Sequence, residues 1–449
     1  MATKQSSKLI PGITGIYQFF IHSKLTAGFL LLICAVIAVL AANIPSLHAL
    51  HEFWEKEISF GFDGNGVSMS IRHFINDVLM AVFFFSVGLE IKREIMVGEL
   101  SSTKKAMLPI FAAIGGMLVP ALLYMTFNEG TESANGWGIP MATDIAFAIG
   151  IISLLGNRCP VALKVFLTAL AIVDDIGAII VLAIFYPSHE LHAVFLAGAA
   201  VITILLLLIN KLGVKSALPY TILGAALFVM VYMSGIHATI AGVILAMTIP
   251  AWTSINEVRF SAGMNMLLDD FRKVSNSEVD VLANKQQLEI IGKMSVNSNM
   301  ITPLLHRLEI QLHPWVNFII MPLFALANAG VMVDFSVLSG GIPPVMTGVF
   351  FGLLFGKPAG IFLFSWLAVK LHIARLPDGT TWKQVLSLGI LGGIGFTMSI
   401  FIDNLAFEDA MLISSGKFAI LMTSLIAACA GLTALYLTTG KQNEHSINH

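Results

Sequence analysis

The residues with the clearest chemical potential are ionisable side chains within long apolar runs. Asp174 and Asp175 are adjacent in one such run, whereas Asp77, Asp144 and Lys357 each lie in another. A charged side chain at the centre of a bilayer costs at least ~2.5–3.5 kcal/mol, so each needs a partner, water or a function. Carboxylate oxygens bind both protons and small hard cations. These residues therefore predict a hydrated cation and proton site within a membrane.

Helix geometry separates the tasks of the two adjacent aspartates. Asp174 lies about 16 Å along its predicted helix, near the middle of a bilayer. Side chains at neighbouring helix positions point about 100° apart. One carboxylate can face a water-filled path while the other faces a second helix. Lys357, also near mid-span, would be the internal counter-charge. A purely architectural ion pair is the alternative, but Asp174, Asp175 and Asp144 together leave excess negative charge.

The composition requires a membrane environment. The 449 residues are 57% hydrophobic and 12% charged, with a mean hydropathy of +0.85. The net charge of −2 excludes nucleic-acid binding as a main role, because no basic excess exists to neutralise phosphates. Cys34, Cys159 and Cys429 lie far apart and have neither disulfide-scaffold nor metal-ligand spacing. We therefore expect an all-α polytopic membrane protein without a cofactor.

Loop charge predicts the orientation of the spans. Nearly all of the 25 Lys and Arg residues fall on the side of the N-terminus, leaving Lys56, Arg72 and Lys417 on the other, so both termini should be cytoplasmic. The first apolar run lacks a clear cleavage site and is interpreted as a span, not a signal peptide. About 12 transmembrane helices are predicted, over 25–44, 74–91, 106–127, 137–155, 162–186, 191–210, 219–234, 236–250, 314–333, 345–371, 384–402 and 412–437. The corresponding divisions are a cytoplasmic segment 1–24, helices 1–8 over 25–250, a cytoplasmic loop 251–312, helices 9–12 over 313–437 and a cytoplasmic tail 438–449.

Two spans carry signals of interruption. The fourth contains Pro140, which removes a backbone donor, followed by Thr143 and Asp144, which can cap a half-helix. The eleventh contains three glycines within 392–395, each weakening a helix by about 1 kcal/mol. Interrupted spans seven apart indicate inverted-topology repeats with two broken helices crossing near the midplane. Asp144 and Lys357 have the signs that would neutralise the exposed half-helix ends. Close glycine packing between helices is the alternative for the eleventh span.

Two segments outside the membrane stand out. Residues 58–71 alternate apolar and small polar side chains around Asp63–Gly66, which predicts a small extracytoplasmic β-hairpin. Its edge could pair with a second copy of the chain or lie flat on its own protomer. Within the cytoplasmic loop, the amphipathic stretch Glu278–Ile291 predicts a surface helix, and a solvated linker is favoured over a regulatory element.

The cytoplasmic end of the second span is rich in charge. Glu90 and Glu94 lie on one helix face with Arg93 within reach of both. Such a cluster at the mouth of a path would attract cations and titrate with pH, but from these residues alone a solvated helix end is the favoured interpretation. On the opposite side, the imidazole of His237 could titrate near neutrality.

The motifs together resemble the NhaA family of bacterial Na⁺/H⁺ antiporters, in order across nearly the whole chain. Only the 251–312 loop departs from this pattern, because it is longer than the family's loop, and any family account of regulation through it is in doubt. The resemblance is carried by Asn76-Asp77, Val87–Glu94, Gly136–Asp144, Asp174–Gly177, Ser234–Thr239, His313–Trp315, Phe324–Gly330, Gly356–Pro358 and Gly395–Phe401.

The resemblance implies specific roles at the midplane. Asp175 would be the main Na⁺ or Li⁺ ligand and proton carrier, with Asp174 as its partner in contact with Lys357. Asp144 and Thr143 would balance helix dipoles where the two unwound spans cross.

Roles outside the midplane are implied in the same way. Glu90, Arg93, Glu94 and His237 match positions associated with pH sensing, and Asp77 matches an accessory acidic position. The 58–71 hairpin would form a homodimer contact.

The expected activity is electrogenic exchange of cytoplasmic Na⁺ or Li⁺ for incoming protons, two per Na⁺, for sodium and pH homeostasis in the bacterial inner membrane. Because cation and proton compete for the same lone pairs, exchange needs no separate coupling device. A Na⁺-coupled symporter of a small organic solute is the alternative, but few polar groups beyond the carboxylates could bind such a solute.

Overall fold

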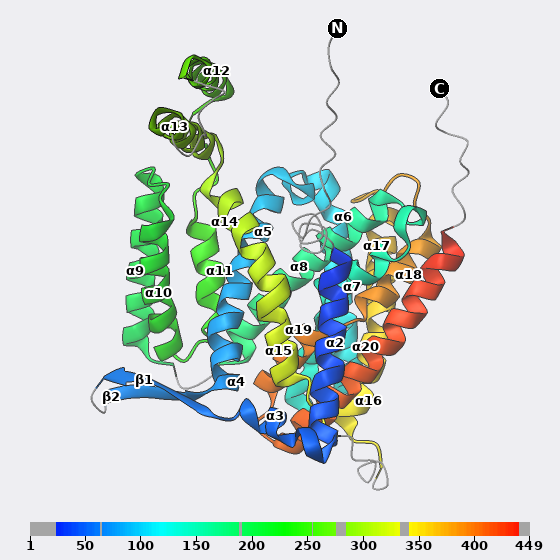
Figure 1. Cartoon of the computed structure of the whole chain (residues 1–449). Coiled ribbons are helices and arrows are strands. Elements are labelled where there is room, and N and C mark those ends of the chain that lie inside the picture. Colours follow the sequence, from blue (N-terminus) through cyan, green and yellow to red (C-terminus); the bar gives the residue numbers. More distant parts are fainter. Residues whose placement is uncertain are drawn as a thin grey trace.

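The computed structural model describes residues 24–62, 65–187, 191–253, 255–274, 284–332 and 341–439, which form a bundle of long apolar helices (Figure 1). Within these residues nine helices are long and apolar enough to cross a membrane, and a bent helix pair makes a tenth. Two shorter apolar helices, α10 and α11, match the divided seventh and eighth spans. The prediction of an all-α polytopic membrane fold is confirmed.

The helices follow one another along the whole described chain. Three π-helical turns, Ile75–Leu79, Val316–Ile320 and Gly352–Gly356, interrupt longer helices. The helices are α2 (Lys24–Asn43), α3 (His48–Phe53), α4 (Ile71–Phe74), α5 (Met80–Val97), α6 (Thr103–Asn128), α7 (Ile145–Ser153), α8 (Val161–Phe185), α9 (Ala193–Lys211), α10 (Ala217–Met233), α11 (Thr239–Thr248), α12 (Glu257–Val274), α13 (Lys285–Ile301), α14 (Leu304–Trp315), α15 (Met321–Asn328), α16 (Pro344–Phe351), α17 (Lys357–Lys370), α18 (Trp382–Gly392), α19 (Phe396–Ala406) and α20 (Ala410–Thr438).

The ninth span begins earlier than its apolar residues suggest. It was predicted over 314–333, but the continuous helical segment starts at Leu304, directly after Pro303. Its first turns carry Arg307 and Glu309, and these charges lower the hydropathy there although the backbone is already helical. The helix of the ninth span therefore begins inside the segment predicted as a cytoplasmic loop.

Glycine contacts set the closest helix approach in the bundle. A Cβ atom on Gly360 of α17 would lie 2.0 Å from the carbonyl oxygen of Gly115 on α6, so only glycine fits there. This contact lies one helical turn from Lys357, which begins α17. The close approach thereby carries the lysine into the centre of the bundle.

The small β-hairpin is present. Strands β1 (Glu57–Phe62) and β2 (Asn65–Ser70) pair antiparallel, with Ser59 opposite Ser68. The first two turn residues of the predicted hairpin, 63 and 64, lie outside the described residues. Figure 1 shows the hairpin projecting past the lower ends of α9 and α10.

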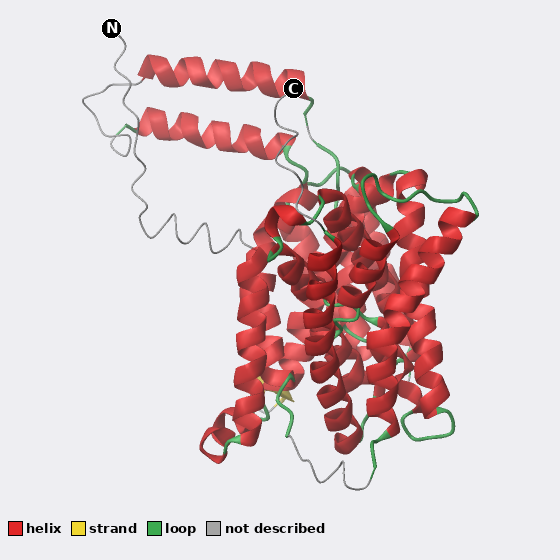
Figure 2. Cartoon of the chain, turned by 90° about the vertical axis from the view of Figure 1, so that its right-hand side faces the viewer, coloured by secondary structure: helices red, strands yellow, loops and turns green. Residues whose placement is uncertain are grey.

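The long loop contains two helices where one was predicted. The predicted helix Glu278–Ile291 is replaced by α13, which runs from Lys285 to Ile301, and residues 275–283 lie outside the described chain. The helix α12, preceding it, was not predicted. Figure 2 shows α12 and α13 lying side by side, away from the main bundle.

Candidate functional site

The two interrupted spans cross inside the bundle. The fourth span is a 3₁₀ segment, Ala134–Met141, followed by extended backbone and then α7. The eleventh is α18 and α19, bent by 48° at their break. The backbone N–H of Asp144 donates to the carbonyl of Ile394 at 2.8 Å, joining the two breaks directly. The predicted pair of broken helices that cross is confirmed.

Asp144 caps both half-helices that start at the crossing. One oxygen of its carboxylate accepts from the backbone N–H of Phe147 at 3.0 Å, in the first turn of α7. The other accepts from the backbone N–H and the hydroxyl of Thr397, at 3.2 and 2.5 Å, in the first turn of α19. Asp144 is 1% exposed. A buried carboxylate is stable here because two positive helix ends face it.

Asp174 is tied to the other side of the crossing. Its Oδ2 accepts from the Thr143 hydroxyl at 2.6 Å and lies 2.8 Å from the Lys357 ammonium. Lys357 also donates to the carbonyl of Met141, at the end of the 3₁₀ segment. All three side chains are at most 2% exposed. The ammonium thus balances both the Asp174 charge and the negative end of a broken helix.

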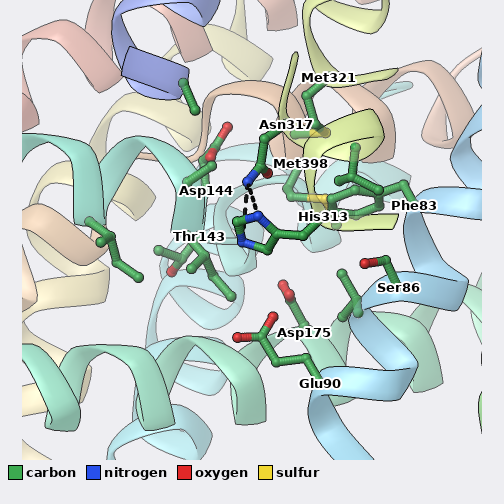
Figure 3. Close-up of a pocket in the computed structure, with 16 residues that line it drawn as sticks. Phe83, Ser86, Glu90, Thr143, Asp144, Asp175, His313, Asn317, Met321 and Met398 are labelled. Atoms are coloured by element: carbon green, nitrogen blue, oxygen red, sulfur yellow. Dashed lines mark hydrogen bonds between the residues drawn. The ribbon is translucent and has the colours of Figure 1, made fainter. Parts of the chain in front are cut away.

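Asp175, the next residue of α8, faces a different environment. It lines a cavity of about 100 Å³ together with Ser86, Glu90, Thr143 and His313 (Figure 3). Among the described residues, no hydrogen bond or ion pair reaches its carboxylate. The cavity has room for several water molecules. The adjacent aspartates therefore point to different partners, one to a lysine and one to an aqueous space.

A second charged cluster lies where α5 meets α14. Arg93 contacts Glu94 at 2.8 Å and Glu309 at 3.2 Å, and Glu90 lies at the 4.0 Å limit of an ion pair. Glu309 was not singled out in the sequence because its helix was placed in the loop. The sequence signal that could have identified Glu309 is its spacing of four residues from His313, which puts both side chains on one face of α14. His313 in turn lines the cavity.

Two candidates from the sequence lie outside the cavity. Asp77, in the first π-helical turn, pairs with His73 at 2.8 Å. His237 lies between α10 and α11 and is 6% exposed. The structure does not bring either residue to Asp175.

Three buried aromatic rings pack together between α5, α15 and α19. Phe84 and Phe324 flank Phe401, with ring centroids 5.7 and 6.2 Å away. The three rings come from α5, α15 and α19 and are at most 2% exposed. The three rings form a buried aromatic layer that joins α5, α15 and α19.

Three amides join the same helices further from the site. Asn328 donates to Asn76 at 2.7 Å, and Asn404 donates to Asn328 at 3.0 Å. These bonds link α15 to the π-helical turn before α5 and to the last turns of α19. Any separation of these helices must break them.

Two further buried charges lie on α19 and α20. Asp403 was placed outside the eleventh span and Lys417 among the external charges, yet they are 0% and 6% exposed. Lys417 lies inside α20, which begins at Ala410, and is therefore buried within a span although it was counted with the charges outside the membrane. Its position within the apolar run 412–437 was the available signal. No group of three or more His, Cys, Asp or Glu residues in the described chain is arranged to hold a metal ion.

Comparisons with known proteins identify the family of the chain. The family model described as Na⁺/H⁺ antiporter 1 matches residues 18–435. Proteins named Na⁺/H⁺ antiporter NhaA from Wolinella succinogenes and Oleidesulfovibrio alaskensis are 46% and 45% identical, over 94% and 95% of this chain and 92% and 95% of theirs. The Helicobacter pylori protein of that name is 44% identical, over 93% of this chain and 94% of its own. The solved sodium–proton antiporter of Methanocaldococcus jannaschii aligns with 95% of this chain and 100% of its own, at 12% identity and a TM-score of 0.43.

Proposed function

The chain belongs to the Na⁺/H⁺ antiporter 1 family and is a multi-pass membrane Na⁺/H⁺ antiporter, and we propose that Asp175 is the carboxylate that exchanges the two ions. On this proposal Asp174 becomes a second ligand for the cation when Lys357 moves away and breaks their ion pair. The protein acts as a transporter, not as an enzyme, and needs no cofactor.

One observation carries the proposal: neighbouring carboxylates at one depth have opposite surroundings. Asp174 is neutralised by Lys357 and by the Thr143 hydroxyl. Asp175 has neither partner and lines the cavity. A carboxylate in a poorly solvated site requires a proton or a cation, and a small space filled with water can deliver both. Asp175 is therefore the position where one ion replaces the other.

Competition at one carboxylate supplies the coupling. Na⁺ prefers anionic oxygen ligands, and a proton occupies the same lone pairs. If the bundle switches the side to which Asp175 is open only when this carboxylate holds a proton or a cation, each switch in one direction carries Na⁺. The switch in the other direction then carries a proton. Serine and threonine hydroxyls at Ser86 and Thr143 line the same cavity and would complete a partly hydrated Na⁺ shell.

The stoichiometry follows from the second acid–base pair. We assign one proton to Asp175 and one to the Asp174–Lys357 pair, so that two protons enter for each Na⁺ and exchange is electrogenic. Li⁺ is a second substrate on this proposal, because it is a smaller cation with the same preference for oxygen ligands. The two sites are coupled, and their titration belongs to the pair.

The charged cluster is proposed to sense pH. Arg93 holds Glu94 of its own helix and Glu309 of α14, so a change in protonation would alter how the two helices pack. Glu90 links this cluster to the cavity because it lines it. His237, outside this cluster, is proposed as a further pH-sensing residue, and Asp77 as an accessory acidic residue.

Alternating access is proposed to separate α19 from α5 and α15. The aromatic layer of Phe84, Phe324 and Phe401 would open while the Asp175 cavity closes toward Glu90. Such rearrangement about a fixed midplane site is typical of transporters with broken helices.

Topology and assembly complete the proposal. Loop charge supports cytoplasmic termini in the bacterial inner membrane, which places the Asp175 cavity open to the cytoplasm. The β-hairpin supports a homodimer, because both strands of a two-stranded sheet have an edge available to a second copy. The divisions 1–24, 25–250, 251–312, 313–437 and 438–449 are retained as proposals, with the cytoplasmic loop shortened to end before Leu304.

Inverted membrane vesicles with an imposed proton gradient and a fluorescent pH dye test the central assignment. Addition of NaCl or LiCl should collapse the gradient, whereas KCl should not. Asp175→Asn should abolish the response, because an amide cannot exchange a proton for a cation. Asp270→Asn, on α12 outside the bundle, is the matched control and should respond as the unaltered protein does.

Two results would reject this assignment. A full Na⁺ response from Asp175→Asn would show that another group carries the ions. Solute uptake driven by Na⁺, without any change of pH, would favour the Na⁺-coupled symporter.

A further inference from the structure

An apolar groove runs between α2 and α20 on the surface that faces the membrane. It consists of two adjoining cavities of about 170 and 290 Å³, which share Leu32, Phe147 and Leu425. Leu32 and Leu425 are 38% and 55% exposed, so the groove opens outward. In Figure 1, α2 and α20 lie on either side of α7. The transport mechanism makes no use of this groove.

The floor of the groove is the reverse side of the helix crossing. Phe147 and Phe396 form it, with ring centroids 5.3 Å apart. The backbone N–H of Phe147 donates to Asp144, and that of Phe396 donates to the hydroxyl of Ser424 on α20 at 3.1 Å. Whatever fills the groove therefore presses on two residues whose amides hold the broken helices in place.

One end of the groove carries a cation suited to phosphate. Leu432 of α20 ends the groove, and one helical turn further Tyr436 stacks on the Arg158 guanidinium, 4.5 Å from the ring centroid. Arg158 has no carboxylate within 4.0 Å in the described part of the chain. An arginine with a free planar fork at a membrane interface suits bidentate contact with a phosphate.

We propose that this groove binds an anionic phospholipid, with its phosphate on Arg158 and one acyl chain against Phe147 and Phe396. The surroundings select the occupant, because lipid chains are the solvent at a membrane-facing apolar surface. An unfilled groove would forfeit dispersion contacts along its whole length. The bound chain would brace the crossing that Asp144 caps, and thereby stabilise the transport site from outside.

Binding can be measured by native mass spectrometry of the full-length protein, released from micelles containing either phosphatidylglycerol or phosphatidylcholine. The unaltered protein should retain phosphatidylglycerol in preference to phosphatidylcholine. Arg158→Gln should reduce the retained phosphatidylglycerol roughly tenfold, as expected for loss of one charge-assisted contact. Retention of phosphatidylcholine should fall less, because its choline cation already offsets the phosphate charge. Arg272→Gln, on α12, should have no effect.

Filling the groove tests the acyl-chain position. Leu32→Trp, or Leu425→Trp if the first variant does not fold, should remove both lipids and lower the thermal unfolding midpoint in lipid. Leu208→Trp, on α9 at a position whose 50% exposure lies between those of Leu32 and Leu425, should do neither. The headgroup assignment would be overturned if the unaltered protein retained phosphatidylglycerol and phosphatidylcholine equally and Arg158→Gln did the same. Loss of a dimer on sedimentation of Leu32→Trp would instead make the groove a protein interface and overturn the proposal.

Discussion

The ammonium of Lys357 lies 2.8 Å from Asp174, whereas the neighbouring carboxylate of Asp175 has no such partner in the described structure. Both Lys357 and Asp174 are at most 2% exposed. The pair is held in a dry interior, where removing one partner leaves a charge that nothing else compensates. Within a single helical turn, this arrangement separates a carboxylate paired with lysine from one that lines the cavity.

Replacement of Lys357 by methionine should destabilise the protein by about 3–5 kcal/mol, because Asp174 would then be buried without its cation. The free energy or midpoint of thermal unfolding in detergent measures this effect. The double variant Lys357→Met with Asp174→Asn should recover most of the loss, since the stranded charge is then absent. A double variant as unstable as the single one would show that lysine packing, not its charge, stabilises the core.

Thr397→Val tests the cap at the crossing. The substitution keeps the shape of the side chain but removes the hydroxyl that donates to Asp144 at 2.5 Å. We expect a loss of about 1–3 kcal/mol in unfolding free energy, because a buried carboxylate oxygen loses a donor. Thr433→Val is the control, since that exposed hydroxyl bonds only its own helix, to Cys429. Equal effects of the two changes would contradict a special role for the crossing.

The sequence predicted the fold and the midplane residues because both depend on local properties. Apolar runs of spanning length identify helices regardless of packing, and an aspartate pair inside such a run is conspicuous at any depth. Pro140 and the glycines within 392–395 marked both broken helices for the same reason. Local signals could not show which aspartate Lys357 would meet, since that depends on the approach of α6 and α17.

The errors arose where charge and helix coincide. The first turns of α14 contain Arg307 and Glu309, so hydropathy assigned them to a loop although a helix begins directly after Pro303. Lys417 was assigned to the outside because it lies near the end of its span, yet it is buried. The amide contacts of Asn328 join segments far apart in the chain, and no single sequence reports such pairing.

Arg93→Gln should move the pH dependence of exchange. Arg93 neutralises Glu94 and Glu309 in the structure, and without it these carboxylates repel each other. Repulsion between like charges favours their protonated forms. We therefore expect the pH at half-maximal Na⁺ response in inverted vesicles to rise, with the maximal response retained. Adding Glu309→Gln should reverse part of the shift, and Arg272→Gln should cause none.

Asn404→Leu should loosen the closed side of the bundle. The Asn404 amide donates to Asn328 at 3.0 Å, and that bond joins α19 to α15 just beyond the aromatic layer. Its loss removes one contact that opening must break, so the closed state becomes less favoured by about 1 kcal/mol. A cysteine at Leu182, buried on the same side next to Phe84, reports the change when the native cysteines are replaced. Its labelling by an impermeant maleimide from that side should quicken about fivefold in Asn404→Leu. Asn210→Leu, which removes a buried amide from α9, is the matched control. Faster labelling in both variants would indicate general loosening, and unchanged labelling in Asn404→Leu would show that the amides do not contribute to closure.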